Sequence, residues 1–145
     1  MQPREPSTVN RHQPDYAALF LQGVTHFNNR EFWHAHESWE ELWLAAETDV
    51  EQFLQGMIQL AAAYHHVQRG THRGAVRLFD AALRRLAPFP SDFSGIDRAP
   101  LEEAARRHRA QFEGADADER LHESQYPRLT LSGAEKSAMP PLDPW

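Results

Sequence analysis

The chain has no cysteine among its 145 residues. Disulfides and thiolate chemistry are therefore excluded, and any metal site would have to use His, Asp or Glu side chains. No run approaches the ~20 apolar residues of a membrane span, and the first residues lack the apolar stretch of a secretory signal. We therefore expect a cytoplasmic protein that does not insert into a membrane.

An excess of positive charge is also missing, because the formal net charge is -6. This balance disfavours nonspecific binding to nucleic acid or to an anionic membrane. The sequence contains no glycine-rich phosphate loop and no serine in a nucleophile-elbow context, so nothing supports nucleophilic catalysis. The composition, 41% hydrophobic and 25% charged, is that of one globular domain with a single core.

The apolar residues recur with a helical period along most of the chain, which predicts an all-α fold. Residues 1–14 are polar and proline-rich and are expected to form a flexible N-terminal arm. Residues 15–112 form the predicted helical domain, and residues 113–145 an irregular C-terminal extension. Thr48 and Thr71 are predicted N-caps, and Gly70 a helix stop. The expected helices cover residues 15–27, 30–47, 48–69, 71–87 and 100–112.

Small residues recur with a spacing that suggests two similar helical hairpins. Gly23 and Ala35 are twelve apart, as are Ala63 and Ala75, and the two pairs are offset by 40 residues. This spacing resembles that of tetratricopeptide repeats, where two helices approach closely at small residues. We therefore predict a compact bundle of four to five helices, built from two stacked helical hairpins.

Residues 32–43, FWHAHESWEELW, combine three tryptophans, two histidines and three glutamates in one predicted helix. With Phe32 at zero on a helical projection, Trp39 and Trp43 lie within about 20° of it, which places them on one seam. His36 and Glu40 follow the same seam, and Glu37 lies further round. These three residues form a polar strip beside the aromatic seam and are the candidate catalytic residues.

The next predicted helix carries a matching polar face. Gln55, Gln59 and His66 are spaced i, i+4 and i+11, so they share one narrow face. If the two helices are antiparallel neighbours, this face and the polar strip converge. We therefore predict a pocket of imidazoles, carboxylates and amides walled by Trp43, with Gln55, Gln59, His66 and Trp43 as ligand-binding residues.

The order and spacing of these motifs resemble a known family, domain of unknown function 309. The resemblance rests on FNNREF at 27–32, HESWEELW at 36–43, FLQGMIQLAAA at 53–63 and the segment 66–74. It covers roughly residues 16–87 and implies a small all-helical protein. It implies no reaction, since none is established for the family. The motif residues that carry over are His36, Glu37, Glu40, Trp43, Gln55, Gln59 and His66.

Several functions remain open for this pocket. It binds a small ligand of unknown identity, or it is a buried hydrogen-bond network that fixes the helix register. In an enzyme alternative, a metal-assisted or general acid/base hydrolase, Glu37 or Glu40 is the base. A divalent metal would then be the cofactor, held by His36, Glu40 and His66. The zincin motif itself is excluded, because Glu40 stands where its second histidine is needed.

A third alternative is a protein-interaction module with an exposed apolar groove away from the strip. Trp33 lies off the aromatic seam and is expected at a pocket mouth or a dimer interface. A homodimer is expected because the helix at 48–69 is apolar over most of its circumference and needs cover. Arg73 and Arg77, spaced i and i+4, mark a solvated face or the site of a phosphate-bearing ligand.

Overall fold

The computed structural model describes residues 15–131. Within that range the chain forms five α-helices, two short 3₁₀ helices and a two-stranded antiparallel sheet in which Ile96 pairs with Leu131. The predicted all-α bundle is confirmed. The elements are α2 (Tyr16–Asn28), α3 (Phe32–Ala45), α4 (Thr48–Arg69), α5 (His72–Leu86), η1 (Phe93–Gly95), β1 (Ile96–Asp97), α6 (Ala99–Phe112), η2 (Glu123–Gln125) and β2 (Thr130–Leu131).

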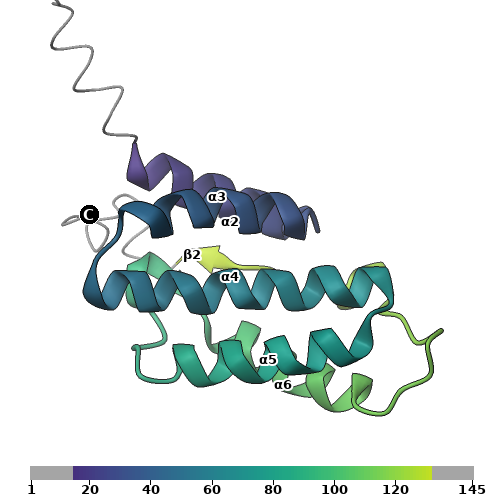
Figure 1. The fold of residues 1–145 in the computed structure, drawn as a ribbon. Helices are drawn as coiled ribbons and strands as arrows, with labels where there is room; N and C mark the ends of the chain where they lie inside the picture. The colour runs from purple at the N-terminus through teal and green to yellow at the C-terminus, as the bar shows by residue number, and fades with distance from the viewer. Residues whose placement is uncertain (1–14, 132–145) are drawn as a thin grey trace, which may run out of the picture.

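Each helix packs against the next one along the chain. Figure 1 shows α4 in the middle of the bundle, with α2 and α3 on one side of it and α5 and α6 on the other. The α2–α3 and α4–α5 hairpins stack where α3 meets α4, as the repeat spacing predicted. The apolar surface of α4 is covered by its own neighbours in the chain, so it does not by itself require a second copy. The homodimer stays a prediction.

The helix ends follow the sequence signals only in part. Asp15 caps α2 by accepting a hydrogen bond from the Ala18 amide at 3.1 Å. Gly70 ends α4 with φ of 80°, in the left-handed region that glycine tolerates. The predicted Thr48 cap is wrong, because Glu47 is the N-cap of α4. Thr71 occupies the N-cap position of α5 as predicted, but its hydroxyl is bonded to His66 and makes no capping hydrogen bond.

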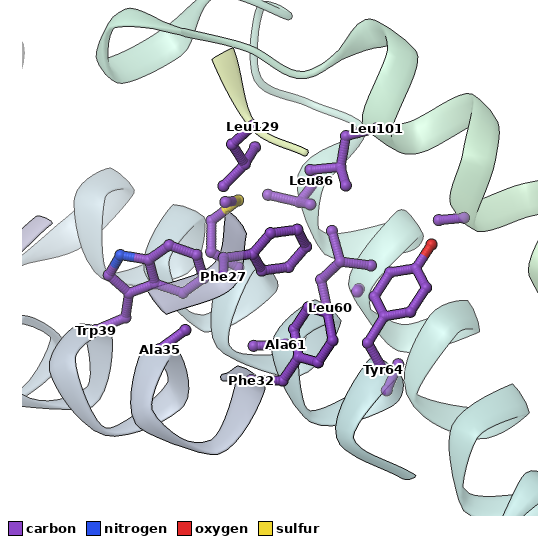
Figure 2. Packing of buried hydrophobic residues seen from close by; sticks show 14 of the residues in the cluster. Phe27, Phe32, Ala35, Trp39, Leu60, Ala61, Tyr64, Leu86, Leu101 and Leu129 are labelled. Atoms are coloured by element: carbon purple, nitrogen blue, oxygen red, sulfur yellow. The ribbon is translucent and has the colours of Figure 1, made fainter. Parts of the chain in front are cut away.

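Aromatic side chains make up the centre of the core. Figure 2 shows Phe27 between Trp39 and Tyr64, and its ring centroid is 6.1 Å from each of theirs. The Trp39 indole donates a hydrogen bond from Nε1 to the Phe20 carbonyl at 3.1 Å. A Cβ atom at Gly23 would lie 2.1 Å from that same Nε1, so the close approach of α2 and α3 requires glycine there.

Arg98 organises the loop between α5 and α6. Its side chain is fully buried, and it donates hydrogen bonds to the carbonyls of Leu86, Phe89 and Pro90 at 3.1, 3.1 and 2.8 Å. Its Nε also donates to Glu102 Oε2 at 2.7 Å. One guanidinium therefore binds the last carbonyl of α5 and two loop carbonyls, in addition to the backbone amides of Phe89 and Phe93 that donate to Leu86 and Pro90.

The segment after α6 returns to the start of the fold. Asn28 at the end of α2 binds both backbone groups of Leu129, at 2.9 Å to its carbonyl and 2.7 Å from its amide. The described part of the predicted C-terminal extension therefore packs on the bundle. The predicted N-terminal arm, 1–14, and residues 132–145 lie outside the described residues. None of the described helices is long and apolar enough to cross a membrane.

Candidate functional site

A small pocket lies between α3 and α4. We call it the α3–α4 pocket, and its volume is about 80 Å³. On α3, Glu40 and Trp43 are three residues apart and so lie on the same side of the helix. Gln55 and Ile58 have the same spacing on α4. The lining residues are Glu40, Trp43, Gln55 and Ile58.

Two ring nitrogens in or beside this pocket make no hydrogen bond in the part of the chain that the structure describes. Trp43 Nε1 is buried and makes no hydrogen bond with the described residues, and the same holds for His36 Nδ1. His36 Nδ1 lies 3.9 Å from Glu40 Oε1, which is too far for a hydrogen bond. A buried donor without a partner costs about 1–3 kcal/mol. Trp43, which lines the pocket, and the neighbouring His36 therefore each carry a buried nitrogen whose hydrogen bond is not made among the described residues.

A wider and shallower hollow lies further along the same two helices. We call it the Trp33 hollow; it is lined by Trp33, His65 and Arg69 and encloses about 390 Å³. The Trp33 ring is 45% exposed and stacks on His36, with centroids 4.5 Å apart and planes 10° apart. Because His36 contacts Trp33 and also approaches Glu40, it lies between the hollow and the pocket. Trp33 thus lines the hollow, and its place at a pocket mouth or a dimer interface stays a prediction.

Electrostatics in the Trp33 hollow favour a neutral imidazole at His65. Partial burial lowers the pKa of His65, and the nearby positive charge of Arg69 lowers it further. The ring therefore stays uncharged at neutral pH and presents one donor and one acceptor nitrogen. Along the contact between α3 and α4, the α3–α4 pocket carries the Glu40 carboxylate and the Trp33 hollow carries the Arg69 guanidinium.

Gln59 and His66 do not join the pocket. Gln59 Oε1 accepts a hydrogen bond from Arg85 Nε of α5 at 3.3 Å. His66 Nδ1 lies 2.5 Å from the Thr71 hydroxyl, and Gly74 of α5 packs against its ring. The polar face of α4 borders both α3 and α5, so side chains about 40° apart on it turn to different neighbours. The predicted single cluster is therefore divided.

The predicted metal and catalytic sets are also only partly assembled. Glu37 is exposed on the outer side of α3, away from the α3–α4 pocket. His66 faces α5, so it does not complete a ligand set with His36 and Glu40. Within residues 15–131 no group of three or more His, Asp or Glu side chains is placed to hold a metal ion. What the structure does bring together is Glu40, Trp43 and Gln55, with His36 beside them.

Sequence reasoning missed the most deeply buried polar pair. Tyr64 and His108 form a hydrogen bond of 2.8 Å between α4 and α6. Burial, helped by the positive charge of Arg107, lowers the pKa of His108 to about 4. Burial raises the pKa of Tyr64 well above its usual range. Nothing in the local sequence marks this pair, because its members are 44 residues apart.

The fold and the polar α3–α4 seam define a small helical-bundle domain. Residues 20–78 match the family model described as Domain of unknown function (DUF309), which confirms the resemblance carried by the motifs. The match covers less than half of the chain, but it includes all seven motif residues.

An uncharacterized protein of Aquifex aeolicus (strain VF5) is 32% identical to this chain over 92 residues. The aligned region covers 60% of this chain and 28% of that relative, so the chain corresponds to little more than a quarter of the relative's length.

Proposed function

We propose that this chain is a small-ligand-binding domain whose site is the α3–α4 pocket. The observation that carries the proposal is the buried Trp43 Nε1, which has no partner among the described residues, on a side chain that lines the pocket together with Glu40. An indole N–H can only donate, so its partner must be an acceptor. A ligand that brings an acceptor to Trp43 and a donor to Glu40 satisfies both groups at once.

The chemistry of the lining residues narrows the ligand to a small amine with a neighbouring hydroxyl or carbonyl. Glu40 binds the ammonium group, and the Trp43 N–H donates to the hydroxyl or carbonyl oxygen. The Gln55 amide can form a hydrogen bond with either of these ligand groups. The volume of about 80 Å³ admits only a head group of a few atoms. The rest of the ligand lies over the exposed Trp33 ring, whose face attracts a cation. The net charge of -6 also favours a cationic ligand.

The same residues favour ligand binding over the alternatives. A structural network would be dry and fully paired, yet the Glu40 side chain is 51% exposed and two ring nitrogens are unpaired. Of the residues predicted for a hydrolase, only His36 and Glu40 lie near each other, with His36 Nδ1 3.9 Å from Glu40 Oε1. An interaction groove would be a continuous apolar surface, whereas Trp33 and Leu44 are the only exposed large hydrophobic side chains in residues 15–131.

Calorimetric titration with ethanolamine tests the proposal, with ethylamine and ethylene glycol as probes that lack the hydroxyl and the amine. We expect ethanolamine to bind more tightly than either. The Glu40→Gln and Trp43→Phe variants should each weaken binding about tenfold, which is about 1.4 kcal/mol. Glu41→Gln is the matched control, because it removes the same charge one residue further along α3 and lies outside the pocket.

Two outcomes contradict the proposal. One is equal binding of all three probes to the parent protein. The other is an equal loss of ethanolamine affinity in the Glu40→Gln and Glu41→Gln variants, which would mean that the affinity depends only on the net charge of the protein.

A further inference from the structure

A second pocket lies on the other side of α4, between the start of α5 and the end of α6. We call it the α5–α6 pocket, and it encloses about 470 Å³. His72, Arg73 and Arg77 line it from α5, and Phe112 and Glu113 from the end of α6. Figure 1 places α5 and α6 across α4 from α3, so this pocket is separate from the α3–α4 pocket.

His72 is the residue in this pocket that most needs a partner. It is only 7% exposed, and neither Nδ1 nor Nε2 makes a hydrogen bond with the described residues. Its ring packs on Phe112, with the centroids 4.8 Å apart. A neutral imidazole always carries one N–H and one acceptor nitrogen, so a buried and unpaired histidine is costly. A ligand that accepts a hydrogen bond in the pocket satisfies its N–H.

The start of α5 adds further donors. This helix of 15 residues has no side-chain cap, because the Thr71 hydroxyl that would cap it is bonded to His66. The first N–H groups of a helix have no partner within the helix, and the aligned peptide dipoles make this end electropositive. The uncapped start of α5 therefore favours an anion near His72.

Two arginines place positive charge at the same pocket. Arg73 and Arg77 are spaced i and i+4, so they lie on one side of α5. Both are exposed, and neither forms an ion pair with any residue of the described range. The nearby Glu113 carboxylate does not compensate them, because it is paired with Arg109. The pocket thus combines two uncompensated guanidinium groups with helix N–H donors.

We infer that the α5–α6 pocket binds the phosphate group of a small organic phosphate. The arginines bind the phosphate oxygens as bidentate donors, and the amides at the start of α5 and the His72 N–H donate to the same group. The volume exceeds that of phosphate alone, and Phe112 and Val76 provide apolar wall for the organic part.

Calorimetric titration of the full chain with phenyl phosphate and with inorganic phosphate, at constant ionic strength and pH 7.5, tests this inference. At that pH both ligands are mainly dianions. We expect phenyl phosphate to bind more tightly than inorganic phosphate, because only its ring contacts Phe112. The Arg73→Gln/Arg77→Gln double variant should weaken its binding at least about tenfold.

The matched control is the Arg84→Gln/Arg106→Gln double variant, which removes the same charge from α5 and α6 outside the pocket. It should bind like the parent protein. Circular dichroism melting checks that both double variants fold, as expected for exposed arginines. The His72 ring protons should shift in NMR spectra when phenyl phosphate is added.

Three results would overturn the inference. They are no saturable binding up to about 10 mM, an equal loss in the two double variants, and unshifted His72 ring protons at saturation. Inorganic phosphate binding as tightly as phenyl phosphate would overturn the assignment to an organic phosphate.

Discussion

The hydroxyl of Tyr64 lies 2.8 Å from Nδ1 of His108 and joins the central helix α4 to α6 inside the core. Both side chains are buried, and their rings meet edge to face with centroids 5.6 Å apart. A charged imidazole would be poorly solvated here, which is why burial lowers the pKa of His108 to about 4. The contact therefore links the packing of α6 to the protonation of one residue.

The first prediction is a loss of stability in mild acid. His108 is neutral in the folded state down to about pH 4, whereas in the unfolded chain it protonates near pH 6.5. The unfolded state therefore binds more protons between these values. The stabilisation is complete above about pH 6.5 and is lost as the pH falls to about 4, by up to roughly 3 kcal/mol.

Urea denaturation at several pH values through this window measures the effect. Burial also lowers the pKa values of His65 and His66, so they add a loss in the same direction. A His108→Gln variant isolates the contribution of His108, and its free energy of unfolding should depend less steeply on pH. Equal slopes for the variant and the parent protein would contradict this account of the buried pair.

The second prediction concerns Arg98, which binds three carbonyls and Glu102. The Arg98→Met variant removes all four interactions and leaves Glu102 without its partner. Because broken buried ion pairs are costly, we expect a loss of about 3 kcal/mol in the free energy of unfolding. Arg106→Met, at an exposed position of α6, is the control and should change the free energy of unfolding by less than about 0.5 kcal/mol. Similar values for the two variants would show that Arg98 does not anchor the loop.

The third prediction tests the close crossing of α2 and α3. A methyl group at Gly23 would collide with the Trp39 indole, so Gly23→Ala should destabilise the protein by about 2 kcal/mol. Trp39→Phe removes the part of the indole that carries Nε1, the atom nearest to the added methyl group. In a double-mutant cycle, Gly23→Ala should therefore cost less in the Trp39→Phe background. If the changes in the free energy of unfolding of the two single variants simply add in the double variant, Gly23 and Trp39 do not interact and the account of the close crossing is contradicted.

The helices could be predicted because their signals are local. The apolar period predicted a helix over residues 15–27, and the structure has Tyr16–Asn28. The caps were less predictable. Thr48 has a good capping sequence, yet α4 already begins at Thr48 and Glu47 precedes it. The hydroxyl of Thr71 was equally available to α5 and to His66, and only the folded chain decides between them.

The part of the candidate site that depends on residue spacing within one helix could be predicted from the sequence. Glu40 and Trp43 share a side of α3 by spacing alone, and the prediction that α4 faces them brought in Gln55. The same reasoning failed for Gln59 and His66. Their face of α4 borders both α3 and α5, and a side chain on it can point toward either helix. His72 and Arg98 were missed because their surroundings come from distant segments and backbone carbonyls, which leave no pattern in the sequence.

The most direct test of the proposed site follows the indole N–H signals of the tryptophans in a nitrogen-15 NMR titration with ethanolamine. Trp43 Nε1 has no hydrogen-bond partner within residues 15–131, whereas Trp39 Nε1 is bonded to the Phe20 carbonyl and serves as an internal control. The account predicts that the Trp43 signal shifts to saturation, that the Trp39 signal stays in place, and that Glu40→Gln abolishes the shift. A Trp43 signal that does not move, or that moves equally in the Glu40→Gln variant, would contradict it.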